Sequence, residues 1–326
     1  MKEKILELLR KNNGYVSGQE ICDLFGVSRT AVWKNINALK NEGYVIDSVN
    51  NRGYKLIAEP DLIDEKSIRR YLHTNWLAST ICYDKQMYST NIKAKQLGET
   101  GAKNGTFVIT DSQTKGRGRR GKTWVSPSGV NSYFTILLRP DLAAEKASMI
   151  TLISALALAR AIKDKSELET VIKWPNDIVA NGKKLCGILT ESSTDLEYIN
   201  YVVVGIGVNM NQTEFPEEIR NIASSIQVET GRHVNRAELI GCFLDYFESY
   251  YEMFLKSGDL SALTGEYNAL LVNRGKEVKI VEQNRERVMK AIGIDETGAL
   301  MVENETGEKE RIISGEVSVR GLYGYT

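Results

Sequence analysis

Five cations and three glycines share the ten residues from Lys115 to Trp124, KGRGRRGKTW. Arginine and lysine supply charged hydrogen-bond donors to phosphate and carboxylate oxygens, and glycine lets a backbone approach a ligand closely. No acidic residue lies between Asp111 and Asp141. The segment therefore predicts a loop that closes around an anion. A solvated basic surface loop is the alternative, and the glycines between the cations argue against it.

The same segment also matches the phosphate-binding P-loop pattern, with Gly116 followed after four residues by Gly121-Lys122-Thr123. A P-loop requires its Lys-Thr pair to open a helix, whose first N–H groups hold the phosphates. Here Thr123 leads into a loop containing Pro127 and then into the strand-like run 130–138. The sequence therefore argues against a P-loop (Walker-type) NTPase.

Four further motifs accompany this loop, namely Ser89-Thr90-Asn91, KWPND at 173–177, GKKLCGILTE at 182–191 and VGIGVNM at 204–210. Each motif by itself is weak evidence for any protein family. In this order and spacing they resemble the biotin–protein ligases, and with the amino-terminal segment described below, the bifunctional ligases that also repress the biotin operon. The resemblance covers essentially the whole chain.

The resemblance implies an ATP-dependent enzyme that joins biotin to AMP, with Mg²⁺ accompanying ATP, and transfers biotin to a lysine of a carboxylase carrier domain. Attack of a carboxylate on a phosphate is opposed by like charge, so the site needs fixed cations around both anions. The expected catalytic residues are Lys184, Arg119, Arg117 and Lys173. The expected biotin-binding residues are Ser89, Thr90, Asn91, Gln113, Gly116, Arg117, Gly118, Arg119, Lys184 and Gly187. The expected nucleotide-binding residues are Arg120, Trp124, Asn176, Asp177, Asn209 and Arg320, and no protein-held metal is expected.

Each of these residues has a structural alternative. Trp124 could be core, Asn176 and Asp177 could form a turn after a proline, Asn209 could cap a strand end, and Lys184 could be a solvated hairpin lysine. Two functional rivals also remain. A lipoate or octanoyl ligase would share the core, and a ligand-sensing repressor would bind without reacting. The Arg/Gly loop and the winged helix argue against the lipoate or octanoyl ligase, and the cationic Lys184 with the whole loop argues against the sensor.

The amino terminus predicts three short helices followed by a hairpin at Asn50–Gly53. Ser17 with Glu20 forms a capping box, and Ser28 caps a third helix. The predicted inward faces are Ile5, Leu8 and Leu9, then Ile21, Leu24 and Phe25, then Ala31, Val32, Ile36 and Leu39. This is a helix-turn-helix with a wing, a fold that reads DNA. A small helical packing domain is the alternative.

The residues expected to contact DNA are Ser28, Arg29, Thr30, Trp33, Lys34, Asn37 and Arg52. Residues 1–60 hold nine Lys and Arg against seven Asp and Glu, a balance of 9 − 7 = +2. This charge is too small for strong sequence-independent binding by one copy. If the chain binds DNA, a dimer that reads a specific site is therefore expected. The resemblance implies a homodimer on a palindromic operator, with biotinyl-AMP as corepressor.

A chain of 326 residues is longer than a single hydrophobic core usually supports, so more than one domain is expected. We expect a winged helix-turn-helix at 1–60, a mixed α/β catalytic core at 61–270, which the resemblance implies to be of the class II synthetase kind, and a small SH3-like β-barrel at 271–326. In the core, Asn181-Gly182 predicts a tight hairpin with Lys184 on its returning strand, and the apolar run 201–208 predicts a central strand. In the tail, strands are expected at 277–281, 288–294, 299–302 and 311–313, with turns at Thr297-Gly298 and Thr306-Gly307.

The isolated cysteines and two histidines favour neither a metal site nor a disulfide framework. The sequence contains no apolar segment long enough to cross a bilayer, and its amino terminus lacks the apolar core of a signal peptide. We therefore expect a cytoplasmic location and no membrane partner.

Overall fold

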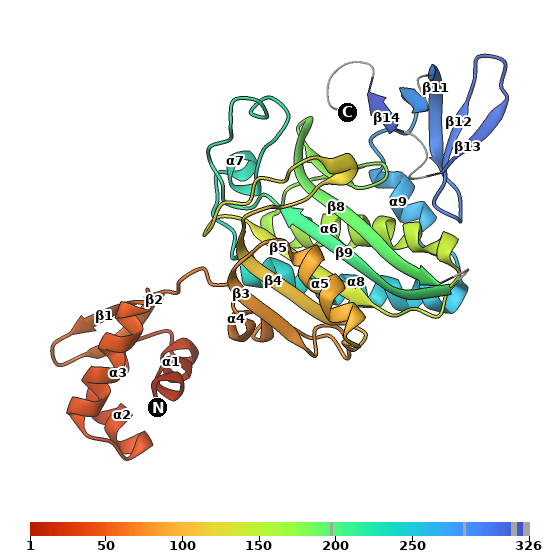
Figure 1. Ribbon diagram of the computed structural model, residues 1–326. Coiled ribbons are helices and arrows are strands. Elements are labelled where there is room, and N and C mark those ends of the chain that lie inside the picture. Colours follow the sequence, from red (N-terminus) through yellow and green to blue (C-terminus); the bar gives the residue numbers. More distant parts are fainter. Residues whose placement is uncertain (196–197, 283–284, 314–317, 322–326) are drawn as a thin grey trace. The chain divides into compact units, whose positions relative to one another are not determined.

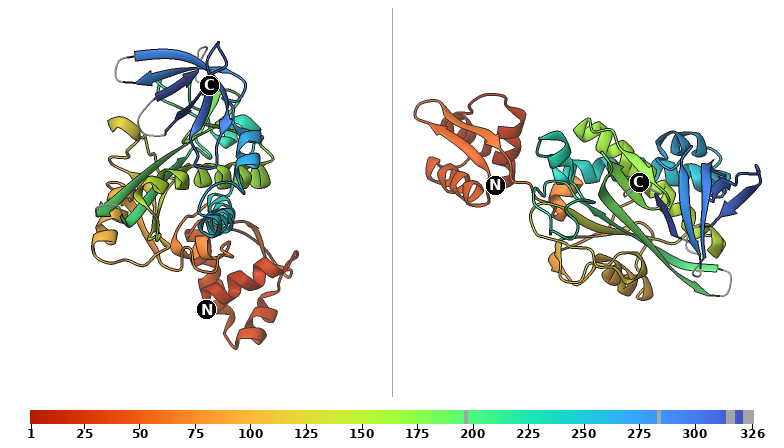
Figure 2. Two further views of the ribbon diagram at one scale, coloured as in Figure 1. Left: turned by 90° about the vertical axis from the view of Figure 1, so that its right-hand side faces the viewer. Right: turned by 90° about the horizontal axis from the view of Figure 1, so that it is seen from above.

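The computed structural model describes residues 1–195, 198–282, 285–313 and 318–321, with only the backbone described at 282, 285 and 318–321 (Figures 1 and 2). The chain divides into two compact units, Met1–Asp61 and Leu62–Thr326. We describe each unit by itself. The boundary proposed at 270–271, within the second unit, stays a prediction.

The first unit is the winged helix that the sequence predicted. Its helices are α1 (Lys2–Lys11), α2 (Gly18–Phe25) and α3 (Arg29–Asn41), and its wing is the antiparallel pair β1 (Val45–Val49) and β2 (Gly53–Ala58). Figure 1 shows them in red and orange. The hydroxyls of Ser17 and Ser28 accept hydrogen bonds from the N–H groups of Glu20 and Ala31, at 3.0 and 3.2 Å. These caps satisfy free amide groups at the starts of α2 and α3.

The inward faces of the first two helices differ from the prediction in the same way. Leu8 is only half-buried and Leu24 is 59% exposed, whereas Leu6 and Cys22 are buried. In α1 the buried residues fall at positions i, i+1 and i+4 rather than i, i+3 and i+4. In α2 the residues at i and i+1 are buried and Phe25, at i+4, is half-buried like Leu8. Both spacings fit one helical face, and packing against the neighbouring elements selects between them.

A mixed sheet forms the centre of the second unit. Its seven strands, among the described residues, are β3 (Ile81–Met87), β4 (Thr106–Gln113), β5 (Ser132–Leu138), β6 (Val171–Lys173), β7 (Asp177–Ala180), β8 (Lys183–Asp195) and β9 (Tyr198–Val208). Their order is β3-β4-β5-β9-β8-β7-β6, with β3 parallel to β4 and the other neighbouring pairs antiparallel. The continuous apolar run in β9 therefore lies in the middle of the sheet, as predicted.

Helices cover both faces of this sheet (Figure 1). One face packs against α6 (Ala147–Ser166) and α8 (Arg236–Ser257), where rings of Phe134 and Phe243 lie 5.4 Å apart. The other face packs against α5 (Thr90–Glu99) through Ala94. Each fully buried large apolar side chain contributes about 1.5–3 kcal/mol relative to exposure. The short helices α4 (Glu65–Arg69), α7 (Ile226–Thr230) and α9 (Thr264–Leu270), and the single 3-10 turns Arg119–Gly121 and Ala144–Lys146, complete the described helices.

The hairpin between β7 and β8 turns at Asn181 and Gly182, whose φ angles of 47° and 77° are both left-handed. Two such residues make the tight turn that matches the twist of the strands. Lys184 is consequently the second residue of β8, on the returning strand, as the sequence predicted.

The carboxy-terminal strands form a second, antiparallel sheet in the order β13-β12-β11-β10-β14. These strands are β10 (Glu277–Glu282), β11 (Arg285–Ile294), β12 (Leu300–Glu303), β13 (Lys309–Ile312) and β14 (Ser318–Gly321). The last was not among the predicted strands. Turns at Gly298 and Gly307, with φ of 79° and 86°, are where the sequence indicated them. In the described part of the chain no helix is long and apolar enough to cross a membrane.

Candidate active site

A cavity of about 730 Å³ opens in the second unit. Its walls come from the amino end of α5, the end of β4, the loop 117–125, the connection from β6 to β7, the glycine-containing parts of β8 and β9, and the segment after β9. Because no helix follows Thr123 and the chain continues as a loop into β5, the P-loop alternative is excluded. Backbone and side-chain groups from distant segments converge on this one space.

One end of the cavity is polar and already hydrogen-bonded. The N–H of Thr90 donates to Gln113 Oε1 at 2.9 Å, and Gln113 Nε2 donates to Ser126 Oγ at 3.0 Å. The hydroxyl of Thr135 lies 2.8 Å from both Thr90 Oγ1 and Asn91 Oδ1. Since a hydroxyl carries one proton, Thr135 can donate to only one of them. This end presents fixed donors and acceptors, which suit a small polar ring.

Asn91 is held by a carboxylate behind it. Its Nδ2 donates to Glu191 Oε2 at 2.9 Å, and Lys95 Nζ lies 2.6 Å from Glu191 Oε1. Burial by itself raises the pKa of Glu191, but hydrogen bonds from Lys95 and Asn91 and nearby positive charge hold that pKa below its usual value. The carboxylate therefore stays ionised and fixes the amide of Asn91 in one orientation.

Glycines form the floor of the cavity. Gly187 of β8 faces Gly207 of β9 across the ladder, and the Trp124 ring lies over this pair. A Cβ added at Gly207 would lie 2.5 Å from Trp124 Nε1, and one added at Gly205 would lie 1.8 Å from Asn91 Oδ1. The floor therefore consists of backbone, which lets planar groups approach the sheet. Trp124 Nε1 is buried and has no hydrogen-bond partner among the described residues.

Two cationic side chains, Arg119 and Lys184, line the cavity and are held by neighbouring groups. Lys184 Nζ lies 2.6 Å from Asp177 Oδ1 and 5.4 Å from the centroid of the Trp124 ring. Arg119 Nη1 donates to Asn176 Oδ1 at 2.8 Å. Burial lowers the pKa of Arg119, and Asp177 raises it in part; an arginine nevertheless stays protonated at neutral pH. The pair Asn176 and Asp177 therefore orients two cations toward the same space.

The other end of the cavity is apolar, and the sequence reasoning missed it. We call residues 212–223 the arch; Phe215, Ile219, Ile222 and Ala223 of the arch line the cavity beside Gln212. The spacing of Phe215, Ile219 and Ile222 was an available signal of a shared face. It was overlooked because the arch contains turns and no regular element. The sequence prediction also did not include Thr135, Glu191 and Lys95. None of them lines the cavity; they hold Asn91, which does.

Most predicted site residues meet in this cavity. The lining includes Ser89, Thr90, Asn91, Gln113, Arg117, Gly118, Arg119, Arg120, Trp124, Lys173, Asn176, Asp177, Lys184, Gly187 and Asn209. Gly116 lies outside the lining, where its carbonyl accepts from the N–H of Trp124 at 3.0 Å. Arg320 pairs with Lys279 through its backbone, and its side chain lies outside the described residues. The described residues contain no group of three His, Cys, Asp or Glu able to hold a metal.

The residues predicted to contact DNA lie in the first unit. Trp33 is 57% exposed on α3, and Ser28, Arg29, Thr30, Lys34 and Arg52 are also exposed, while Asn37 is half-buried. Arg29 donates through Nη2 to Gln19 Oε1 at 2.8 Å, and the guanidinium of Arg52 lies 4.7 Å from the centre of the Tyr15 ring. The exposed face of α3 is thus polar apart from one indole.

Comparison with known proteins shows which protein family shares these features. A profile described as the Biotin/lipoate A/B protein ligase family matches residues 83–209, an HTH domain profile matches 2–55, and a Biotin protein ligase C terminal domain profile matches 275–320. The Bifunctional ligase/repressor BirA of Bacillus subtilis (strain 168) is 35% identical, and the alignment covers 98% of each chain. The chain belongs to the biotin protein ligase family.

Other members support the same relationship. The Bifunctional ligase/repressor BirA of Escherichia coli (strain K12) is 29% identical over 97% of this chain and 96% of that protein. The solved biotin protein ligase from Aquifex aeolicus in complex with biotin and ATP is 31% identical, with a TM-score of 0.65, over 74% of this chain and 99% of that chain. Within the biotin protein ligase family, then, this member has the three-part organisation expected from its sequence: an HTH domain, a ligase core and the family's C-terminal domain.

Proposed function

We propose that this chain joins biotin to AMP at the expense of ATP, and then transfers biotin to a lysine of a biotin carboxyl-carrier domain. The observation that carries the proposal is one cavity lined by the polar groups of Thr90 and Gln113, by cations that include Arg119 and Lys184, and by apolar side chains of the arch. The polar end, around Thr90 and Gln113, suits the ureido ring of biotin. The apolar end, under the arch, suits the adenine.

In the first step a carboxylate oxygen of biotin attacks the α-phosphorus of ATP, and the bond from that phosphorus to the bridging oxygen breaks to release pyrophosphate. Arg117, Arg119 and Lys184 stabilise the charge that accumulates on the phosphate oxygens. In the second step the neutral amine of the acceptor lysine attacks the biotinyl carbonyl carbon, AMP leaves, and the amine loses its proton. We propose that Lys173, which lines the cavity, assists this transfer.

We propose that Mg²⁺ enters as part of the ATP substrate. This ion is usually held through phosphate oxygens, water and one or two carboxylates rather than by a cage of protein ligands. Asp177, which lines the cavity beside Lys184, is the candidate carboxylate.

The first unit supports a second role for the same chain, as a repressor of biotin genes. A homodimer would place two copies of α3 on a palindromic operator, with Arg29 and Trp33 at the base edges. We propose that biotinyl-AMP is the corepressor. The loop 115–124 holds five like charges, so ordering it costs repulsion and entropy that the adenylate, with its phosphate, offsets. Closure of this loop would then favour the dimer.

The decisive experiment incubates the purified chain with ATP and, in parallel, biotin, lipoate or octanoate, and measures pyrophosphate release and labelling of a carrier domain. Release and labelling with biotin alone support the proposal. Release with lipoate or octanoate instead would assign a lipoate-type ligase, and ligand binding without release would assign a sensor.

A mobility-shift assay with operator DNA, with and without biotinyl-AMP, tests the repressor role. Limited proteolysis and sedimentation of the free, biotin-bound and adenylate-bound chain test the loop: unchanged cleavage and unchanged dimerisation would overturn the coupling.

A further inference from the structure

The arch is held to the rest of the second unit at both of its ends. At the end nearer α7, the N–H of Lys184 donates to the carbonyl of Ile222 at 2.8 Å, and the N–H of Ser224 donates to the carbonyl of Lys184 at 3.0 Å. At the end nearer β9, Asn131 Nδ2 donates to Gln212 Oε1 at 2.6 Å. One attachment uses a residue of the cavity itself. The other uses Asn131, which does not line the cavity.

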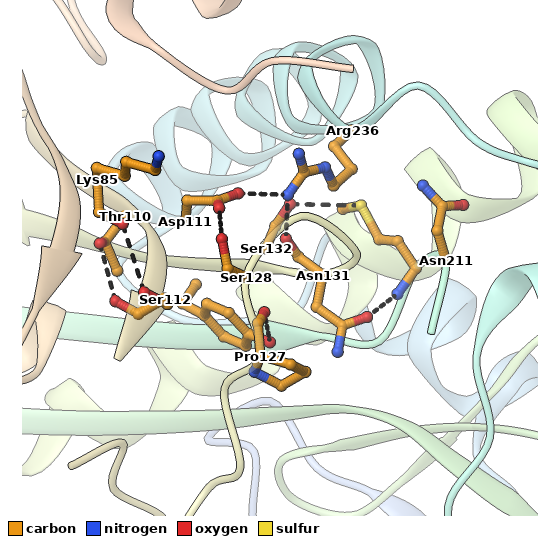
Figure 3. Close-up of polar contacts among 12 residues, drawn as sticks. Lys85, Thr110, Asp111, Ser112, Pro127, Ser128, Asn131, Ser132, Asn211 and Arg236 are labelled. Atoms are coloured by element: carbon orange, nitrogen blue, oxygen red, sulfur yellow. Dashed lines mark hydrogen bonds and ion pairs between the residues drawn. The ribbon is translucent and has the colours of Figure 1, made fainter. Parts of the chain in front are cut away.

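Asn131 is fully buried and is held in place by two groups besides Gln212. Its Oδ1 accepts a hydrogen bond from the N–H of Met210 at 2.9 Å, and its carbonyl accepts one from Arg236 Nη1 at 2.9 Å. Figure 3 shows this carbonyl beside the guanidinium that also reaches Asp111. Arg236 is 3% exposed and lies 2.8 Å from Asp111 Oδ1, and Asp111 in turn accepts from the hydroxyl of Ser128. A buried ion pair therefore fixes the backbone from which Asn131 projects.

The amide of Gln212 is used at both of its polar atoms. Oε1 accepts from Asn131, and Nε2 donates to the carbonyl of Glu214 at 2.6 Å. Because Glu214 directly precedes Phe215, this bond from Gln212 fixes the backbone next to Phe215. Without the donor on Asn131, Oε1 of Gln212 has to find another partner, and the amide is free to turn.

We propose that Asn131 is a positioning residue for the nucleotide end of the cavity, acting through Gln212 on the arch. This inference rests on the proposed function for the name of the substrate, since it takes the apolar end as the adenine end. The polar end is held separately, through Thr90, Gln113 and Thr135. Loss of the Asn131 side chain therefore weakens ATP binding more than biotin binding.

The test is a double-mutant cycle of Asn131→Ala, Gln212→Ala and the pair. We expect each single change to raise KM for ATP by about tenfold, the factor that corresponds to about 1.4 kcal/mol, with KM for biotin changed less than roughly twofold. Because the two side chains act as one unit, the pair should also raise KM for ATP by about tenfold and not by about a hundredfold. Binding of ATP alone, measured by calorimetry, should weaken in parallel.

The matched control is Asn268→Ala in α9. Asn268 also makes two hydrogen bonds through its side chain, to the N–H and the carbonyl of Ile294, and does not line the cavity. It should lower the midpoint of unfolding without changing KM for ATP. If Asn131→Ala does not fold, Gln212→Met, at a half-buried position, removes the same contact and should reproduce the loss of ATP affinity.

Three results would overturn the proposal: an unchanged KM for ATP in folded Asn131→Ala or Gln212→Met, equal increases for ATP and biotin, or single effects that multiply in the pair. These outcomes are separable from failure of the proposed function. Wild-type protein that releases no pyrophosphate with biotin would overturn that function. The calorimetric titration with ATP would still decide whether Asn131 positions the arch.

Discussion

The ammonium of Lys184 and the carboxylate of Asp177 lie 2.6 Å apart on neighbouring strands that meet at the hairpin of Asn181 and Gly182. Both side chains are largely buried, with 24% and 13% of their surface exposed. The carboxylate balances the positive charge of the lysine. When a substrate phosphate arrives, the ammonium can be shared, and its position is already set by the turn.

Replacing Lys184 with alanine should abolish most adenylation. Removal of one preorganised donor to a developing charge costs about a hundred- to a thousandfold in rate. The variant should stay folded, because Lys184 follows a hairpin turn and contributes no apolar core. Pyrophosphate release measures the effect, and Lys183→Ala, at the neighbouring position outside the cavity, is the matched control. Near-normal release by Lys184→Ala would remove this lysine from the catalytic set.

Gly205→Ala should impair binding at the polar end of the cavity. The added Cβ would lie 1.8 Å from Asn91 Oδ1, so Asn91 must leave its contacts with Thr135 and Glu191. We expect KM for biotin to rise and stability to fall by about 1–3 kcal/mol, the usual cost of overpacking. Gly265→Ala in α9, where nothing lies within 4 Å of the added atom, should leave KM for biotin unchanged and should not lower stability, because alanine favours a helix over glycine. Equal behaviour of the two variants would contradict the close approach at Gly205.

Asp111→Asn should destabilise the chain in a pH-dependent way. Burial by itself raises the pKa of Asp111, but hydrogen bonds from Ser128 and Arg236, and the charge of Arg236, hold that pKa below its usual value. A carboxyl whose pKa is lower in the folded state stabilises that state above its unfolded pKa, near 4, and loses this contribution as pH falls through the folded pKa.

At pH 7 the variant should therefore lose about 3–5 kcal/mol, because a buried arginine loses its counter-charge. The difference from wild type should shrink as pH falls below about 4. Denaturant unfolding of both proteins at pH 7, 5, 4 and 3 measures it. A difference that is constant over this range would mean that the charge of Asp111 does not stabilise the fold.

Removing residues 1–61 should abolish operator binding and retain adenylation. The Met1–Asp61 and Leu62–Thr326 units have separate cores, and every residue that lines the cavity belongs to the second. Mobility shift and pyrophosphate release measure the two activities. A truncated chain that still bound operator would place the DNA-binding surface elsewhere.

Arg29→Ala in the full chain should weaken operator binding by about 1–3 kcal/mol, the usual contribution of a base contact by arginine. Adenylation should not change. Lys4→Ala, exposed on α1, is the control for a general loss of positive charge. If the two variants bind operator equally well, Arg29 makes no base contact.

Local sequence signals determined the elements and much of the cavity. Asn181-Gly182 can form only a narrow set of turns, so it placed Lys184 on a returning strand. The glycines and cations of 115–124 predicted a loop without a following helix, and the apolar run ending at Val208 predicted a central strand. Each of these inferences depends on residues that are neighbours in the chain, where backbone sterics and periodicity act directly.

Only the tertiary structure decided which distant groups meet. Arg236 and Asp111 are 125 positions apart, and no local pattern in the sequence indicates that they pair or that Asn131 links them to Gln212. The arch was missed because it forms turns and no regular element. The spacing of Phe215, Ile219 and Ile222 indicates a shared face, but only packing over the cavity decides where that face lies. The exposed Leu24 has the same cause, since i+1 and i+3 positions fit one helical face equally well until a partner surface selects between them.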